Sequence, residues 1–401
     1  MIPHLRQQYN AGFTPEKYAA YLHELGSIYP GSLEFRLAET PVFVPSSVTR
    51  QMIDTAEAVV DLLLQPGYRQ QSERAIPPAL RVPNETPCPE FMVLDFGLCR
   101  GASGAPEPRL IELQGFPSLF AWHLALPEAA ARHFSLPAGF SPFLNGFDRP
   151  SYVALLRHII VGDHRPENVV LLELFPHRQK TRVDFYATRD LLGVHPVCLT
   201  EISKEGKNLY YYREGKKTAI HRIYNRLIFD ELLQQAPEVR EKGKILQEEL
   251  DVEWVVHPNW FYRLSKFTLP FLQHPCVPET AFLNELETLP PDLENYVLKP
   301  LFSFSGQGVV IDVTGQDIER ITDGENWILQ KKVDYAPLIQ TPDEGAKAEL
   351  RLFYFWPPGA PRPLATNNLA RLSKGKMIGV NYNKDKDWVG GSFCLFESGE
   401  K

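Results

Sequence analysis

The feature that most constrains the fold of this chain is a glycine-rich loop between two short apolar segments, within residues 294–313. Residues 296–298 predict a buried strand that ends at Lys299, and residues 309–313 predict a second strand. The loop between them contains Ser303, Ser305, Gly306, Gln307 and Gly308. A lysine at a strand end supplies positive charge for phosphate, and glycine lets backbone N–H groups surround phosphate oxygens without a Cβ in the way. We interpret the segment as a hairpin lid over a nucleotide; an ordinary hairpin with a glycine turn has the same pattern.

Two familiar phosphate-binding motifs do not describe this loop. The P-loop runs from a strand into a helix and ends in Gly-Lys followed by Ser or Thr, and the dinucleotide fingerprint also opens a helix. Here both flanks predict strands. The loop would therefore approach phosphate as a flap.

Length and composition narrow the class of protein. With 401 residues the chain can form two or three domains with substantial cores. The net charge of −7 argues against a nucleic-acid-binding protein, which usually has a basic face. No apolar run reaches the roughly 18 residues of a membrane span, the first residues show no signal-peptide core, and the five cysteines show no CxxC spacing. We therefore expect no membrane association, no disulfide framework and no zinc site, in a protein of the reducing cytoplasm.

Residues 1–84 predict a mainly helical region. Within residues 46–64, apolar side chains recur on one face of a helix that Ser46 and Ser47 could cap and that stops before Pro66. This apolar face consists of Met52, Ile53, Ala56, Val59, Val60, Leu63 and Leu64. We expect it to form part of the core.

Two strands that carry polar residues are predicted next, with the sequences FMVLDFGL and RLIELQ, and a helix from about Pro117 follows them. The first strand carries Asp95, and the second carries Glu112 and Gln114 on one face. Such an oxygen-only set suits Mg²⁺, which takes few protein ligands and completes its shell with water and nucleotide phosphates. The alternative is that these side chains line the solvent face of a hairpin.

Residues 150–255 alternate between predicted strands and helices, which favours a doubly wound α/β domain. The clearest pair is an apolar strand at residues 167–175 and a helix at residues 182–193 that Gly193 stops. Ligands of such sheets bind at the carboxyl ends of the strands. The polar residues after the first strand are therefore candidates, although each could be an ordinary surface residue: Glu173, His177, Arg178 and Lys180.

The last third of the chain carries cations on several predicted elements. Arg263 and Lys266 lie on a predicted helix. Glu349 and Arg351 share one face of a predicted strand, and Arg371 lies on the next strand. A solvated strand face is the alternative interpretation of these three residues.

The order of these segments resembles the ATP-grasp superfamily, in particular the circularly permuted branch typified by the synthetase domain of glutathionylspermidine synthase. The pattern DFGL followed by RLIELQGFPSL is similar to the family's aspartate on one strand and Glu-x-Asn on the next, then a small polar turn and a helix. In the permuted branch this pattern precedes the lysine-bearing strands, as it does here. Gln114 stands where the family has asparagine, and the connection between Asp95 and Glu112 is longer than in the family pattern.

The resemblance implies a role for each candidate residue. The Mg²⁺ ligands would be Asp95, Glu112 and Gln114. The residues that bind ATP would be Lys266 (or, in its place, Arg263), Lys299, the phosphate lid with Ser305, Gly306, Gln307 and Gly308, and the hinge strand with Gln330, Lys331 and Val333. The catalytic residues would be Lys299, Arg351 and Arg371, with the two arginines facing the phosphates and the acyl phosphate.

The resemblance also implies an α/β architecture: an ATP-grasp fold preceded by a doubly wound domain and a helical N-terminal region. Residues 85–140 and 334–401 would form the C-terminal ATP-grasp subdomain, which the circular permutation divides between the two segments. Residues 141–257 would form the Rossmann-like domain, and residues 258–333 the lid subdomain.

The implied activity is ATP- and Mg²⁺-dependent ligation of a carboxylate to an amine through an acyl phosphate. The substrates would be small molecules or peptides, whose identity the sequence does not reveal, and neither nucleic-acid nor membrane partners are expected. Two other functions fit the same residues. One is a small-molecule kinase on the same scaffold, and the other is a non-catalytic nucleotide-binding protein in which Gln114 marks a lost metal site.

Overall fold

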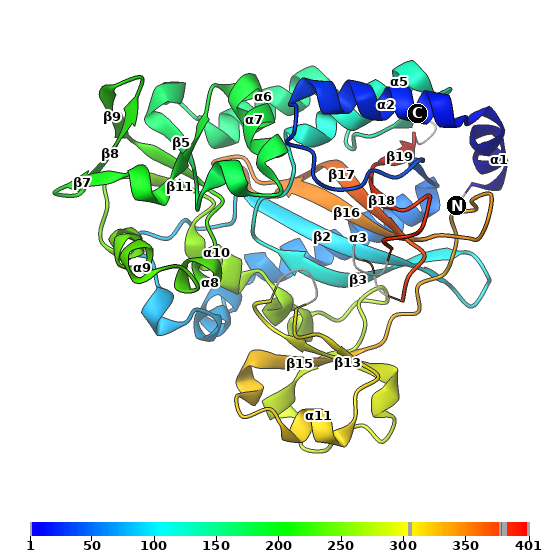
Figure 1. Cartoon of the computed structure of the whole chain (residues 1–401). Coiled ribbons are helices and arrows are strands. Elements are labelled where there is room, and N and C mark those ends of the chain that lie inside the picture. The colour runs from blue at the N-terminus through cyan, green and yellow to red at the C-terminus, as the bar shows by residue number, and fades with distance from the viewer. Residues whose placement is uncertain (1, 304–306, 377, 379–382, 399–401) are drawn as a thin grey trace.

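The computed structural model describes residues 2–303, 307–376, 378 and 383–398. Within these ranges, helices and five β-sheets make this a mixed α/β protein (Figure 1). Three of the sheets position the candidate site: a central antiparallel sheet, a parallel sheet and a smaller lid sheet. None of the helices in the described ranges combines the length and the apolar character that a membrane span requires.

The central sheet joins segments from distant parts of the chain in the strand order β18-β17-β16-β2-β3. The strands are β2 (Phe91–Arg100), β3 (Pro106–Gln114), β16 (Lys347–Phe355), β17 (Leu364–Ser373) and β18 (Gly390–Ser392). Residues 91–99 of β2 are all buried, so both faces of this strand are covered, which explains its nearly continuous apolar run. Asp95 is the charged residue in that run.

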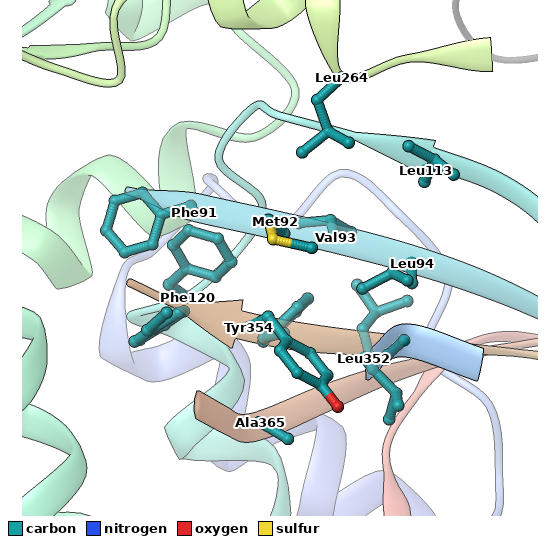
Figure 2. Close-up of a cluster of buried hydrophobic side chains, with 14 of the residues drawn as sticks. Phe91, Met92, Val93, Leu94, Leu113, Phe120, Leu264, Leu352, Tyr354 and Ala365 are labelled. Carbon is teal, nitrogen blue, oxygen red and sulfur yellow. The ribbon is translucent and has the colours of Figure 1, made fainter. Parts of the chain in front are cut away.

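The largest apolar core lies against this sheet. Figure 2 shows part of it, in which side chains of β2 cluster with Leu113, Phe120, Leu264, Leu352 and Tyr354. These side chains come from segments distributed along most of the chain, so the core of the central sheet depends on contacts between residues that are far apart in the sequence.

Helix α3 (Ser46–Leu64) contributes the predicted apolar face to this core. Met52, Ala56, Val59 and Val60 are buried as predicted, whereas Leu64 is 45 % exposed. The helix begins at Ser46 with Pro45 in the N-cap position, so the predicted serine cap is wrong.

The parallel sheet has the order β11-β10-β5-β6, and all its neighbouring strands are parallel. The strands are β5 (Val169–Glu173), β6 (His195–Cys198), β10 (Arg222–Asn225) and β11 (Glu253–Val255). Helices α6 (Arg149–Ile160) and α7 (Arg182–Leu192) precede and follow β5, and Gly193 ends α7 with φ of 76°. A separate antiparallel meander consists of β7 (Ser203–Glu205), β8 (Asn208–Arg213) and β9 (Lys216–Ile220).

The lid sheet contains the glycine-rich hairpin and has the order β12-β15-β13-β14. The strands are β12 (Thr280–Phe282), β13 (Tyr296–Pro300), β14 (Val310–Ile311) and β15 (Trp327–Lys331). Leu298, Val313 and Leu329 give the lid a small core of its own, beside helix α11 (Gly315–Glu319). A short 3-10 turn, Leu283–Glu285, follows β12.

Segments near both ends of the chain pack together in a third small sheet, of order β1-β19-β4. Its strands are β1 (Val42–Val44), β4 (Phe140–Ser141) and β19 (Cys394–Glu397). Helix α5 begins at Ala125, later than the start predicted near Pro117. The remaining helices are α1 (Pro3–Gly12), α2 (Pro15–Ile28), α4 (Tyr68–Gln71), α5 (Ala125–His133), α8 (Phe229–Leu233), α9 (Pro237–Gly243) and α10 (Pro258–Arg263).

Candidate functional site

A row of charged side chains crosses the central sheet. Glu112 of β3 lies opposite Asp95 of β2, and Asp95 lies opposite Arg351 of β16. Two residues before Arg351 on the same strand, Glu349 lies opposite Arg371 of β17. Residues opposite each other in an antiparallel pair project from the same face of the sheet. The strand register therefore brings these five residues, each singled out from the sequence, onto one face.

Lys299 of the lid sheet reaches this face at a bulge in β3. The pairing of β2 with β3 shifts by one residue at Ile111, and a bulged residue is left out of the ladder. The Ile111 carbonyl oxygen accepts a hydrogen bond from Lys299 Nζ at 3.2 Å, and Gln330 Oε1 accepts another at 2.5 Å. Burial lowers the pKa of Lys299 to about 8, although the nearby charge of Glu112 opposes the shift. The lid lysine is thus buried and joins β13 to β3. Figure 1 shows the lid sheet below the central sheet.

Close packing between β3 and the segment after α10 positions Lys266. The Gly115 N–H donates to the Leu264 carbonyl at 2.7 Å, and a Cβ at Gly115 would lie 2.8 Å from a backbone carbonyl oxygen of α10. Only glycine permits this approach. Lys266 Nζ lies 3.1 Å from Glu112 Oε1 and donates to the Ser303 carbonyl at 2.8 Å. Lys266 therefore connects β3 with the glycine-rich loop.

Asp95 is the buried centre of an ion-pair network. Its two carboxylate oxygens accept hydrogen bonds from Arg351 Nε at 2.5 Å and from Arg351 Nη2 at 2.6 Å. Arg371 Nη2 donates to Asp95 Oδ2 at 3.2 Å and also to Glu349. Burial alone would raise the pKa of Asp95, but the charges of Arg351 and Arg371 outweigh burial and lower it. The carboxyl is therefore ionised at neutral pH, with both oxygens engaged.

Glu349 is the second buried carboxylate of the network. It binds Arg371 and accepts a hydrogen bond from the Tyr335 hydroxyl at 2.9 Å. Burial raises the pKa of Glu349 in spite of Arg371. Tyr335 follows the lid sheet in an irregular segment, and its sequence context carries no signal that would have identified it.

The network has an open side and a closed side. The side chains of Glu112 and Arg371 are 32 % and 38 % exposed, whereas those of Asp95 and Glu349 are 3 % and 7 % exposed. An incoming ligand would therefore meet Glu112 and Arg371 before either buried carboxylate.

Ser118 connects the network to the parallel sheet. Arg351 Nη1 donates to Ser118 Oγ at 3.2 Å, and Arg226 Nη1 donates to the Ser118 carbonyl at 2.7 Å. Arg226 is buried and directly follows β10. Its position directly after a strand of the α/β region is the sequence signal that could have identified it. The charged network thus extends to the carboxyl end of the parallel sheet.

Two of the four polar residues singled out after β5 line a small cleft. The cleft has a volume of about 180 Å³ and is lined by Phe175, Pro176, His177, Arg178, Cys198, Thr200 and Glu201. Glu173 is buried instead; it accepts a hydrogen bond from the Leu174 N–H at 2.7 Å, and burial raises its pKa to about 8. Lys180 is exposed. The carboxyl ends of β5 and β6 are therefore hollowed, as the topology predicts.

Several predicted ATP-binding residues lie outside the network. The buried Arg263 forms ion pairs with Glu85 and with the half-exposed Glu73, so Lys266 is the one of the two alternatives that reaches the site. Gln307 and Gly308 are exposed. Ser305 and Gly306 lie outside the described residues.

The predicted hinge at residues 330–333 is partly occupied by contacts within the lid. The Gln330 side chain binds Lys299, and the Lys331 N–H donates to the Glu279 carbonyl at 2.8 Å. Val333 is half-buried just beyond β15. The contact of this strand with adenine stays a prediction.

The predicted Mg²⁺ ligands are assembled in part. Glu112 and Gln114 lie on one strand with partly exposed side chains, and carboxylate and amide oxygens suit Mg²⁺. Both oxygens of Asp95 are engaged by arginines. Across the ranges that the structure describes, no group of three or more His, Cys, Asp or Glu side chains could hold a metal ion. Metal binding therefore stays a prediction, for which Glu112 and Gln114 are the residues that fit.

Comparison with known proteins supports the fold. A glutathione synthetase-like effector from Globodera pallida, solved in its apo form, matches with a TM-score of 0.59 and 10% sequence identity, over 96% of this chain and 98% of the effector chain. At this identity the match shows a shared fold alone. No family model matches the sequence, and no curated protein matches it.

Proposed function

We propose that this protein is an ATP-dependent ligase of the ATP-grasp superfamily, which joins a carboxylate to an amine through an acyl phosphate and forms ADP. One observation carries the proposal: at the junction of the lid and central sheets, Lys266 pairs with Glu112 and Lys299 binds the neighbouring Ile111 carbonyl, beside two arginines. The fold shared with a glutathione synthetase-like effector supports a ligase, because the synthetase in the name of that protein is a ligase.

The charges at this junction suit a polyphosphate. Lys266, Lys299, Arg351 and Arg371 supply four positive charges, and Asp95, Glu112 and Glu349 supply three negative charges. The two buried carboxylates are already paired with arginine. Only Glu112 is left to balance the two lysines, so the lysines carry the surplus positive charge for the phosphates of ATP. Charge-assisted hydrogen bonds of this kind are among the strongest in proteins.

In this proposal Lys299 and Lys266 bind the phosphates of ATP, and the loop that begins at Ser303 covers them. Glu112 and Gln114 would hold Mg²⁺, which when bound neutralises the negative charge of the phosphates. The structure supports the lysine roles because Lys266 Nζ lies 3.1 Å from Glu112 and Lys299 Nζ lies 3.2 Å from the carbonyl of the preceding residue, Ile111.

The chemistry requires alignment and charge stabilisation more than covalent help from the protein. A carboxylate oxygen of the substrate attacks the γ-phosphorus, the bond to ADP breaks, and an acyl phosphate forms. The amine then attacks the acyl carbon, phosphate leaves, and the amine loses a proton. Arg371, on the open side, would bind the oxygens of the acyl phosphate, because a planar guanidinium donates to two oxygens at once.

These contacts leave the identity of the substrates open, but one buried cation, Arg226, indicates where a substrate binds. Arg226 lies at the carboxyl end of the parallel sheet and shares Ser118 with Arg351. A substrate that bears a carboxylate would be stabilised there, next to the site of phosphoryl transfer.

The test is ATP turnover over a panel of amino acids and short peptides, with hydroxylamine present. A ligase forms ADP with a subset of the panel and also gives a hydroxamate, because hydroxylamine traps an acyl phosphate. ADP formation without hydroxamate would identify a small-molecule kinase. ATP binding without ADP formation would identify a non-catalytic nucleotide-binding protein, and failure to bind ATP would refute the proposal altogether.

Substitutions at the junction separate catalysis from folding. We expect Lys299→Ala and Glu112→Ala to lower ATP turnover by roughly 10²–10³, as loss of one electrostatic donor does in other enzymes. The circular dichroism spectrum should be unchanged. Lys207→Ala is the matched control, because Lys207 pairs with Glu249 on the exposed meander. Turnover near that of the wild type in either site variant would contradict the site assignment.

A further inference from the structure

Building on the proposed function, the geometry points to a positioning role for Asp95 in place of the metal-ligand role that its sequence context predicts. Asp95 holds Arg351 and Arg371 as an anion clamp, and Glu112 with Gln114 are the protein ligands left for the metal. Three observations support this assignment: the occupied oxygens of Asp95, its place behind the open side, and the arginines that depend on it.

The carboxylate oxygens of Asp95 are already used. Arg351 binds both of them through two nearly parallel hydrogen bonds of 2.5 and 2.6 Å, and Arg371 adds a third contact of 3.2 Å to Oδ2. Mg²⁺ requires near-ideal octahedral geometry and carries two positive charges. A cation bound to Asp95 would lie beside two guanidinium groups, which repel it.

Asp95 and Glu112 differ in how deeply their side chains are buried. The side chain of Asp95 is almost completely buried, whereas about a third of the Glu112 side chain is exposed on the open side of the network. Mg²⁺ retains water and takes most of its remaining ligands from the nucleotide phosphates. Lys266 contacts Glu112 through Oε1, but the partial exposure of this side chain lets Glu112 meet such a hydrated cation. Asp95 accepts three hydrogen bonds from arginines and is separated from solvent by the residues around it.

Both arginines depend on Asp95 for their orientation. Asp95 and Ser118 together bind three nitrogen atoms of Arg351, which fixes the plane of its guanidinium. Asp95 and Glu349 both accept hydrogen bonds from one nitrogen of Arg371, Nη2, while 38 % of the Arg371 side chain is exposed on the open side. If Asp95 turned to a metal, Arg351 would lose its carboxylate partner inside the protein, which is strongly unfavourable. The network is therefore arranged to present Arg371 to an anion.

The first arm of the test measures metal binding, with the full chain and the non-hydrolysable analogue AMP-PNP. Mn²⁺ is titrated and its free concentration is followed by electron paramagnetic resonance. We expect Asp95→Asn to keep the Mn²⁺ affinity within about threefold of the wild type, and Glu112→Gln to weaken it by about tenfold or more. Asp343→Asn is the control, because Asp343 is an exposed carboxylate paired with Lys374.

The second arm measures the anion clamp without any metal. Inorganic phosphate is titrated by calorimetry in the presence of EDTA. Asp95→Asn should weaken phosphate binding by about tenfold, as Arg371→Gln does, because both remove an arginine from its working position. Glu112→Gln should not weaken it, because Glu112 repels phosphate.

Each result decides the inference. Loss of Mn²⁺ affinity in Asp95→Asn equal to that in Glu112→Gln, or phosphate affinity unchanged in Asp95→Asn, would overturn it. If Asp95→Asn does not fold, Arg351→Lys replaces it: the positioning role predicts weaker phosphate binding with unchanged Mn²⁺ affinity, and a ligand role predicts stronger Mn²⁺ binding as Asp95 is released. A wild-type protein that binds neither AMP-PNP nor Mn²⁺ would refute the proposed function, whereas one that binds both but not phosphate would refute the clamp alone.

Discussion

The titration of Lys299 should make nucleotide binding depend on pH. Burial lowers the pKa of this lysine to about 8, so the free protein loses the charge within an accessible range of pH. For that pKa, about nine in ten molecules carry the charge at pH 7 and about one in eleven at pH 9. If only the charged form binds phosphate well, the affinity should fall about tenfold between pH 7 and pH 9, which corresponds to about 1.4 kcal/mol.

The assay is calorimetric titration of ADP from pH 7 to pH 9 in EDTA, which removes metal ions. The terminal phosphate of ADP is largely deprotonated over this range. Binding should take up close to one proton at pH 9, which the dependence of the measured heat on buffer ionisation enthalpy reports. Lys299→Arg should bind ADP with an affinity that is flat from pH 7 to pH 9, because arginine stays charged. Lys207→Arg, on the exposed meander, should behave as the wild type.

The same shift makes a prediction about stability, with its sign set by linkage. Between pH 8 and the ordinary lysine pKa near 10.5, the unfolded chain binds a proton that the folded chain does not, so the free energy of unfolding should rise with pH. Relative to Lys299→Met, the rise should approach about 3 kcal/mol over that range in urea titrations. If the ADP affinity of the wild type stays constant from pH 7 to pH 9, this lysine does not bind the phosphates. The same conclusion follows if the ADP affinity of Lys299→Arg falls with pH as steeply as that of the wild type.

Three further substitutions test the contacts that build the junction. Gly115→Ala places a Cβ 2.8 Å from a carbonyl oxygen of α10, and it should cost about 1–3 kcal/mol of stability in urea unfolding and weaken ADP binding; unchanged stability would show that the packing is loose. Arg263→Ala leaves the nearly buried Glu85 with only the longer, 3.5 Å contact to the guanidinium of Arg69, so it should lower stability by about 3 kcal/mol while ADP affinity of the folded protein is retained. Loss of ADP binding with the fold intact would instead place Arg263 in the nucleotide site. Tyr335→Phe removes the hydrogen bond to Glu349 and should cost about 1–3 kcal/mol in thermal or urea unfolding, and an effect below a few tenths would mean that water replaces the hydroxyl.

The contacts of Asp95 show how much of a residue's role a sequence motif can predict. The sequence places an aspartate on a strand next to a Glu-x-Gln strand, and the structure places both strands together as predicted. The pattern contains no information about Arg351, which is 256 positions away and binds both oxygens of Asp95. The partner changes what the aspartate can do, because a carboxylate that accepts from a guanidinium has fewer lone pairs for a metal.

The local structure follows from the amino-acid sequence: the apolar runs of β2 and β5, helix α7 with Gly193 after its last turn, and the lysine-bearing strand before a glycine-rich loop. These features depend on neighbouring residues, so periodicity and glycine positions predict them. Two contacts arise only when distant segments pack together: Lys299 binds the Ile111 carbonyl, 188 positions away, and Lys266, but not Arg263, reaches Glu112. Such contacts depend on strand register, a bulge and the close approach at Gly115, which a shift of one residue would abolish and which short sequence patterns do not encode.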